Sequence, residues 1–155
     1  MINPATVPVD KISHDAIEVL ITMRLLFMYW GVEPLQWKRD ISKAFRRVPI
    51  CPEHLEFAFV IWRDQGAEWV SQHLCMPFGT VSAVYSWHRV GYVLWLIVVD
   101  LFRAPLARCV DDFFGCSRAG VVWTGGAVLT VLSRLLGFMT DPGKDADNMI
   151  QVVVL

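Results

Sequence analysis

The hydrophobic and polar positions along the chain predict alternating helices and strands. Apolar residues recur at helical spacing over residues 13–30, where the first residue is a serine suited to capping, and Gly31 is expected to end this helix. A connecting segment then leads into a short strand that ends at Asp40. One or two helical turns are expected over residues 43–48, because Pro49 cannot continue a helix.

The middle of the chain has the pattern of an antiparallel hairpin. Residues 56–62 and 67–76 are rich in strand-forming side chains, and a polar turn at residues 63–66 separates them. Pro77 interrupts the second strand, and a long helix is expected to follow and to end near Phe102. The centre of the chain is therefore predicted to hold one hairpin and one long helix.

The last third of the chain predicts a second hairpin, a helix and a strand. Two short strands at residues 106–116 flank a tight turn formed by Asp111 and Asp112. A helix is expected over residues 117–137, capped by its first residue, a serine, and an apolar strand over residues 149–155. The whole order predicts an α+β fold with a mostly antiparallel sheet and helices packed on one face.

The composition limits the classes of protein that fit this pattern. The 155 residues are 55% hydrophobic and 19% charged, so the chain must bury most of its surface, meet a membrane, or be covered by other segments. Apolar stretches at residues 17–30, 91–99 and 119–132 are too short or too interrupted to favour membrane spans over buried helices. A net charge of −1 is unusual for a protein that binds nucleic acid by itself.

The cysteines and the N-terminus indicate an intracellular protein, in the cytoplasm or the nucleus. None of the four cysteines has CxxC spacing or a zinc pattern with histidine, so we expect reduced core residues. The first residues lack the basic start and apolar run of a secretory signal.

Three aspartates are the strongest candidates for chemistry. Asp111 and Asp112 sit between two strand-like segments, where adjacent like charges repel and a divalent cation would relieve the repulsion. If the strand ending at Asp40 is a neighbour in the sheet, all three carboxylates converge and can bind two Mg²⁺ ions about 3.5 to 4 Å apart. The pair also fits a solvated polar turn, and Asp40 also fits a helix N-cap.

Four segments in order resemble the core motifs of reverse transcriptases. They are Asp40-Ile-Ser-Lys-Ala-Phe45, Met76-Pro-Phe-Gly79 before a helix, Val110-Asp-Asp112, and Gly137 to Lys144. The resemblance covers roughly residues 37–155 and is closest to retrotransposon and retrovirus-like enzymes, including the DIRS-like group. Cys109 departs from it, because most relatives carry a tyrosine there.

The resemblance implies a two-metal site for nucleotidyl transfer. Asp40 and Asp111 would bind two Mg²⁺ ions, for which Mn²⁺ can substitute, and Asp112 would assist them. The main-chain carbonyl of Ile41 would join the metal ligands. Lys144 matches a lysine that acts as general acid on the pyrophosphate leaving group, although a solvated loop lysine fits the sequence as well.

The resemblance also implies a nucleotide-binding surface. Phe45 falls where the family places an aromatic gate that excludes a 2′-hydroxyl, and an ordinary core phenylalanine is the alternative. Phe78 and Gly79 would lie beside the incoming nucleotide and the templating base, and a plain strand-to-helix turn is the alternative.

The resemblance thus implies the palm core of an RNA-directed DNA polymerase that extends a primer with dNTPs. Residues 1–36 would be a remnant of the fingers, and residues 37–155 a palm truncated before the thumb. Its partners would be an RNA or DNA template-primer and the fingers and thumb of a longer polyprotein, with no stable membrane partner. An inactive retroelement remnant and a small membrane-associated protein are the competing interpretations.

Overall fold

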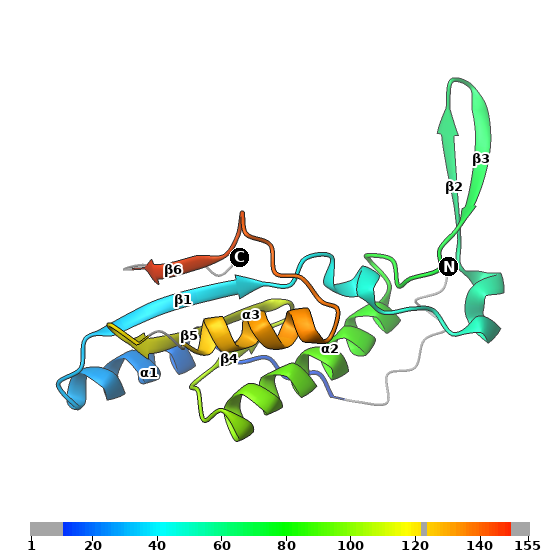
Figure 1. The fold of residues 1–155 in the computed structure, drawn as a ribbon. Coiled ribbons are helices and arrows are strands. Elements are labelled where there is room, and N and C mark those ends of the chain that lie inside the picture. Colours follow the sequence, from blue (N-terminus) through cyan, green and yellow to red (C-terminus); the bar gives the residue numbers. More distant parts are fainter. Residues whose placement is uncertain (1–10, 122–123, 150–155) are drawn as a thin grey trace. The chain divides into compact units, whose positions relative to one another are not determined.

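The computed structural model describes residues 11–121 and 124–149, which form two compact units (Figure 1). Among them, the first unit contains residue 11 and residues 43–87, and the second contains residues 12–42 and 88–149. Helix α2 (Val81–Leu96) runs from the first unit into the second. The candidate carboxylates all belong to the second unit.

The second unit is built on a four-stranded antiparallel sheet. Its strands are β1 (Pro34–Asp40), β4 (Ala107–Cys109), β5 (Asp112–Arg118) and β6 (Ala146–Met149), and its helices are α1 (Ile17–Tyr29), α3 (Gly125–Leu135), the end of α2, and the π-helix η4 (Ile97–Leu101). The strand order is β4-β5-β1-β6, and each neighbouring pair is antiparallel. The predicted α+β class with a mostly antiparallel sheet is confirmed.

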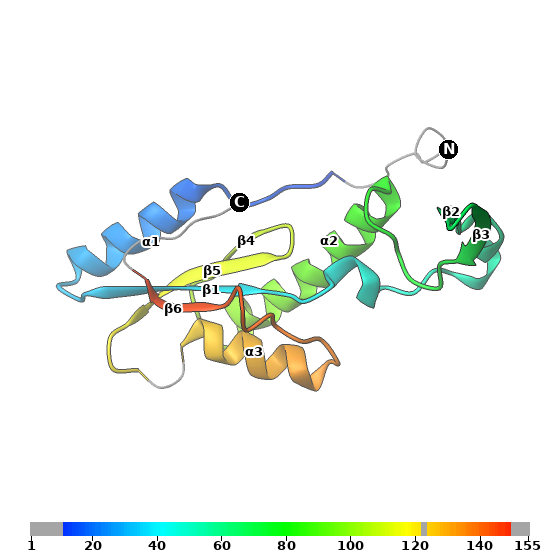
Figure 2. The same ribbon diagram turned by 90° about the horizontal axis from the view of Figure 1, so that it is seen from above.

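Helices cover both faces of this sheet, whereas the sequence analysis expected them on one face. Figure 2 shows α1 and α3 on opposite sides of β5 and β1. The reason lies in β5, where the consecutive residues Phe113 and Phe114 are both buried, with exposures of 0% and 1%. Consecutive strand residues point to opposite faces, so both faces are apolar and need a cover. Leu20 of α1 packs in one core cluster with Phe114 and Cys116.

The other face is organised around Trp37, which is 2% exposed and donates from Nε1 to Oγ of Ser117 at 3.1 Å. Glycines let the main chain approach this indole closely. A Cβ atom on Gly115 of β5 would lie 2.7 Å from Trp37 Cζ2 and 2.5 Å from the Pro105 carbonyl oxygen. A Cβ atom on Gly125 of α3 would lie 2.8 Å from the same indole carbon. This packing fixes β1, and therefore the strand end at Asp40.

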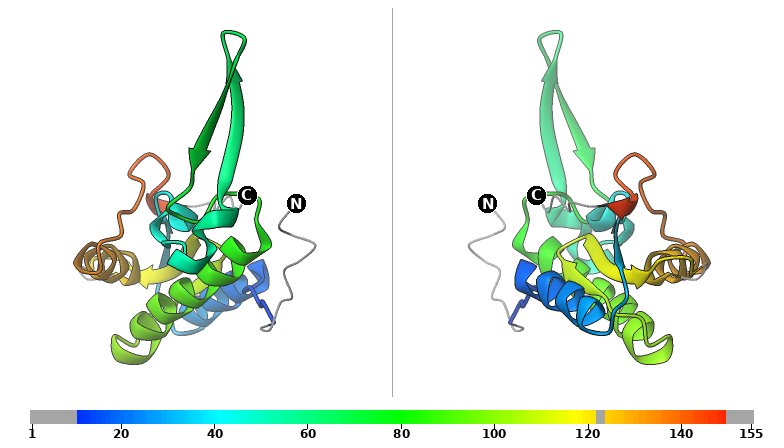
Figure 3. Two further views of the ribbon diagram at one scale, coloured as in Figure 1. Left: turned by 90° about the vertical axis from the view of Figure 1, so that its right-hand side faces the viewer. Right: turned by 90° about the vertical axis from the view of Figure 1, so that its left-hand side faces the viewer.

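The first unit contains a two-stranded hairpin and short helical turns. Its elements are the 3₁₀ helices η2 (Ala44–Arg47) and η3 (Pro52–Phe57), the strands β2 (Phe59–Asp64) and β3 (Ala67–Gln72), and the start of α2. The predicted antiparallel hairpin is confirmed, and Trp62 stacks on its cross-strand partner Trp69 with ring centroids 5.8 Å apart. The two strands of this hairpin, β2 and β3, have the twist that is usual for paired strands (Figure 3).

Two predicted helix starts were wrong. Ser117 lies inside β5 opposite Leu35, and α3 begins eight residues later at Gly125. Thr124 caps that helix by accepting from the Ala127 N–H at 3.1 Å. Ser13 is not the cap of α1 either, because that helix starts at Ile17 and has no side-chain cap. Serine often caps helices, but pairing with β1 and burial place Ser117 in a strand.

Several predicted boundaries also shift. Residues 56 and 57 belong to η3 rather than to the hairpin, and the second hairpin strand ends at Gln72. The long helix changes to a π-helix at Ile97. The last strand of the described residues is β6, which ends at Met149, and residues 150–155 of the strand predicted over 149–155 lie outside the described residues. In residues 11–121 and 124–149, no helix is both long enough and apolar enough to cross a membrane.

Replacing Gly115 by alanine tests the packing around Trp37. Because the added Cβ has no room against the indole and the Pro105 carbonyl, we expect Gly115→Ala to lower the free energy of unfolding by about 1–3 kcal/mol. Urea unfolding followed by circular dichroism measures the change. Gly143→Ala is the matched control, since its Cβ would meet its nearest atom at 3.4 Å. Equal effects of the two substitutions would contradict the packing account.

Candidate functional site

Three aspartates lie at one end of two neighbouring strands. Asp40 is the last residue of β1 and faces Asp112, the first residue of β5, in the antiparallel register. The N–H of Ile41 donates to the carbonyl oxygen of Asp111 at 3.2 Å, which joins the end of β1 to the β4–β5 turn. The structure thus brings together the strands on which the sequence analysis placed these carboxylates. Their catalytic role stays a prediction.

The turn that carries Asp111 has two residues, as predicted, but it is shifted by one residue toward the N-terminus. Cys109 pairs with Asp112, so the two turn residues are Val110 and Asp111, and Asp112 already belongs to the sheet. Val110 has φ of +54°, in the left-handed region that β-branched residues rarely adopt. The turn therefore presents Asp111 from a strained main chain.

Two lysines neutralise part of the negative charge. Nζ of Lys38 lies 3.0 Å from Oδ2 of Asp112, and both side chains are nearly buried. Nζ of Lys144 donates to Oδ2 of Asp40 at 3.2 Å, and this lysine side chain is 60% exposed. The hydrogen bond to Asp40 and its charge raise the pKa of Lys144, so the lysine is held in its protonated form.

The two lysines do not fully offset the negative charge and burial of the aspartates, because the pKa values of Asp111 and Asp112 stay raised. Burial raises the pKa of Asp111, and the charges of Asp40 and Asp112 raise it further, while a main-chain hydrogen bond and Lys144 oppose the change. Burial also raises the pKa of Asp112, against the hydrogen bond and charge of Lys38. Oδ1 of Asp112 is buried and accepts no hydrogen bond from the described residues. Such a group of carboxylates favours a cation.

The carboxylates of Asp40, Asp111 and Asp112 are suitable ligands for a hard divalent cation, but in this structure they are not arranged as a metal centre. In the described part of the chain, no three histidine, cysteine, aspartate or glutamate residues are grouped closely enough to hold a metal ion. Carboxylate oxygens are the ligands that Mg²⁺ prefers, and the unpaired Oδ1 of Asp112 is one such oxygen. Asp40, Asp111 and Asp112 would hold the ion, and Lys38 and Lys144 would have to move aside.

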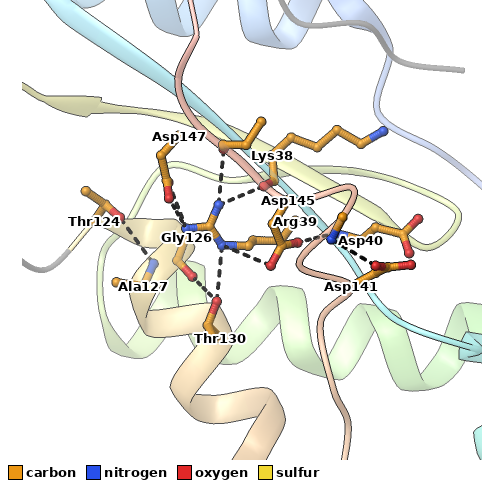
Figure 4. Close-up of polar contacts among 12 residues, drawn as sticks. Lys38, Arg39, Asp40, Thr124, Gly126, Ala127, Thr130, Asp141, Asp145 and Asp147 are labelled. Atoms are coloured by element: carbon orange, nitrogen blue, oxygen red, sulfur yellow. Dashed lines mark hydrogen bonds and ion pairs between the residues drawn. The ribbon is translucent and has the colours of Figure 1, made fainter.

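A network around Arg39 ties the segment before and within β6 to β1 (Figure 4). Nη2 of Arg39 contacts both carboxylate oxygens of Asp147 at 2.7 and 2.9 Å, and its Nη1 donates to the Ala146 carbonyl at 3.1 Å. Its Nε donates to Oγ1 of Thr130 in α3 at 3.1 Å. Arg39 therefore fastens β6 and α3 to the strand that ends at Asp40.

Residues 141–145, just before β6, form hydrogen bonds with the main chain of Asp40. The Asp40 N–H donates to Oδ1 of Asp145 at 3.2 Å, and its carbonyl oxygen accepts from the Asp141 N–H at 2.9 Å. The loop between these two aspartates carries Lys144 and brings it to the Asp40 carboxylate. The predicted general-acid lysine thus lies at the predicted metal ligand.

Sequence reasoning missed Lys38, Arg39, Asp145 and Asp147. Strand alternation gave a usable signal for two of them, because Lys38 shares the sheet face of Asp40 and Arg39 points to the other face. Nothing in the sequence indicated the two aspartates, since their contacts cross more than 100 residues of chain.

The predicted nucleotide-binding residues Phe45, Phe78 and Gly79 lie in the first unit. The rings of Phe45 and Phe78 meet edge to face at 5.2 Å, and the Arg46 guanidinium lies 5.8 Å from the centre of the Phe78 ring. Gly79 has φ of +86°, and no atom lies within 4 Å of a Cβ built on it. The positive φ explains why this residue is a glycine, and its place beside a nucleotide stays a prediction. Ile41 is fully buried beside Thr140 in the second unit.

Solved structures resemble this chain in fold. A foamy viral protease-reverse transcriptase bound to an RNA/DNA hybrid matches with a TM-score of 0.55 and 15% identity, over 78% of this chain and 15% of that chain. The same kind of enzyme bound to double-stranded DNA gives 0.53 and 17%, over 77% and 21%. Telomerase from Candida albicans, in complex with a fragment of telomeric RNA, gives 0.55 and 9%, over 91% and 31%. The fold is reverse transcriptase-like.

Sequence comparison adds nothing to this structural likeness. No family model matches the chain, and no curated protein matches it. The chain spans less than a third of the length of the three solved chains above.

The raised pKa of Asp111 predicts an unusual dependence of stability on pH. Between its unfolded and folded pKa values the native state binds more protons, so stability falls as pH rises through that range. We therefore expect metal-free Asp111→Asn to melt at a higher temperature than the parent at pH 7, with the difference vanishing near pH 4, about the ordinary pKa of aspartate.

Thermal unfolding in EDTA, followed by circular dichroism between pH 4 and 8, measures this difference. Asp64→Asn, at an exposed aspartate of the β2–β3 hairpin, is the control and should leave the curve unchanged. A difference that grows on acidification would contradict the account.

Proposed function

We propose that this chain is the palm core of an RNA-directed DNA polymerase of the retrotransposon or retrovirus-like kind. The observation that carries the proposal is the register of β1 and β5, which sets Asp40 opposite Asp112 beside the turn residue Asp111, within a reverse transcriptase-like fold. Two carboxylate-bearing strand ends in this fold support transfer of a nucleotide from a dNTP to a primer 3′ end. Within this kind, the sequence resembles the DIRS-like group.

In this proposal Asp40 and Asp111 hold two Mg²⁺ ions and Asp112 assists them, with the Ile41 carbonyl as a further ligand. When bound, such ions stabilise the attacking and leaving oxygens of an in-line phosphoryl transfer. Lys144, whose pKa is raised, would donate its proton to the pyrophosphate leaving group.

The nucleotide itself would be selected in the first unit. Phe45 would act as the gate against a 2′-hydroxyl, and its contact with Phe78 supports this role, because the second ring holds the first in place. Gly79 would keep the segment beside Phe78 free of a side chain. Arg46, which faces the Phe78 ring, adds a cation for the triphosphate.

The partners would be an RNA or DNA template-primer and the fingers and thumb of a longer polyprotein. The foamy viral enzymes of similar fold are bound to an RNA/DNA hybrid and to double-stranded DNA. A net charge of −1 makes tight binding of nucleic acid by this chain alone unfavourable. Residues 1–36 would then belong to the fingers and residues 37–155 to the palm.

An inactive member of the same fold is the second candidate. Lys38 forms an ion pair with Asp112, and Lys144 forms one with Asp40. In an inactive protein these positive charges would take the place of a metal ion. Cys109 also stands where most reverse transcriptases have a tyrosine.

Primer extension on an RNA template with dNTPs and Mn²⁺ or Mg²⁺ separates the two candidates. The polymerase proposal predicts extension by the chain supplemented with fingers and thumb segments, and a loss of at least 100-fold in Asp111→Asn, as expected when a group that stabilises transition-state charge is removed. Asp64→Asn is the matched control and should keep full activity. Equal extension by parent and Asp111→Asn, or none with the added segments, would contradict the proposal.

A further inference from the structure

Arg108 lies behind the turn that carries Asp111 and is almost fully buried, with 4% of its surface exposed. Its Nη1 donates to the Val110 carbonyl oxygen at 3.0 Å, and its Nη2 lies 3.0 Å from Nδ1 of His88. A guanidinium has only donors, so Nδ1 of His88 must accept and the ring proton must be on Nε2. The buried cation is therefore directed at a main-chain carbonyl and a neutral ring.

Neighbouring residues hold both the side chain and the main chain of Arg108 in place. A Cβ atom on Gly91 of α2 would lie 2.9 Å from Nη1 of Arg108, so a larger residue at this position would make the guanidinium shift. The main chain of Arg108 is held by Asp15, whose Oδ2 accepts from the Arg108 N–H at 2.8 Å and whose N–H donates to the Arg108 carbonyl at 3.0 Å. Burial lowers the pKa of Arg108, while the charge of Asp15 opposes this change.

The turn residue Val110 is held from both sides. Its carbonyl oxygen accepts from Arg108, and its N–H donates to Nδ1 of His14 at 3.4 Å. Its φ of +54° is strained for valine, and such a conformation persists only where the surroundings impose it. Asp111 follows directly, so the direction of its side chain depends on this peptide.

We propose that Arg108 is a positioning residue that, through the Val110 carbonyl, holds the β4–β5 turn in the conformation in which Asp111 binds a divalent cation. The inference rests on the proposed polymerase function. Burying the Arg108 guanidinium costs solvation free energy, and the hydrogen bond to the carbonyl adjoining Asp111 is a contact that offsets this cost.

Mn²⁺ binding to the full chain, measured by calorimetry, tests the inference with three substitutions. Arg108→Met should weaken binding at least fivefold while the fold is retained, and Arg134→Met, at an exposed arginine of α3, should have no effect. Glycine adopts a positive φ without strain, so in a Val110→Gly background Arg108→Met should weaken binding less than twofold. An equal loss in both backgrounds would overturn the inference.

Arg108→Lys provides a second variant should methionine prevent folding. It keeps a buried cation but lacks the planar fork that reaches two acceptors at once, and we expect an intermediate loss of affinity. Parent-like affinity of every folded Arg108 variant would overturn the inference.

A readout that needs no metal separates this inference from the proposed function. Backbone chemical shifts of isotopically labelled protein report φ of Val110, which should be positive in the parent and negative in Arg108→Met. A positive φ in both would overturn the positioning role even if Asp111→Asn abolishes Mn²⁺ binding. If Asp111→Asn leaves Mn²⁺ binding unchanged, the proposed function fails, and the φ of Val110 alone decides the role of Arg108.

Discussion

The antiparallel pairing of β1 with β5 brings like charges together, and the rest of the second unit accommodates that repulsion. Asp40 and Asp112 face each other across the pairing, and Asp111 follows at the adjoining turn. Burial raises the pKa of Asp111, and the charges of Asp40 and Asp112, which disfavour its ionisation, raise it further. Lys38 and Lys144 offset part of this charge from two sides of the cluster.

The remaining packing keeps the carboxylate-bearing strand ends from moving apart. Trp37 locks β1 against glycines of β5 and α3, where a larger side chain would not fit. Arg39 anchors β6, the other neighbour of β1, through hydrogen bonds from Nη2 to both carboxylate oxygens of Asp147. Charge-assisted hydrogen bonds of this kind are shorter and stronger than hydrogen bonds between neutral groups. These anchors hold the strand ends that carry the proposed cation ligands.

Much of this arrangement could be predicted from the sequence because it depends on local pattern. Strand-forming runs beside Asp40 and on each side of Asp111 predicted the neighbouring strands, and the β2–β3 hairpin followed from its turn. The motif order indicated the fold that the foamy viral and telomerase structures share with this chain.

The features that the sequence analysis missed depend on partners distant in the chain. Ser117 has the chemistry of a helix cap, but pairing with Leu35 and a hydrogen bond from Trp37 place it in a strand. Phe113 and Phe114 gave no sign of which helix would cover which face. The ion pair of Lys38 with Asp112 spans more than 70 residues and exists only because of the strand register.

The most direct test of the central claim is to map where a divalent cation binds. Substoichiometric Mn²⁺ broadens the amide signals of nearby residues in a ¹⁵N-labelled sample of the chain. The account predicts that the signals of Asp40, Ile41, Asp111 and Asp112 broaden first and that added Mg²⁺ restores them. Broadening that begins instead at exposed acidic residues such as Glu53 and Glu56, with the three aspartates unaffected, would contradict a metal site at the paired ends of β1 and β5.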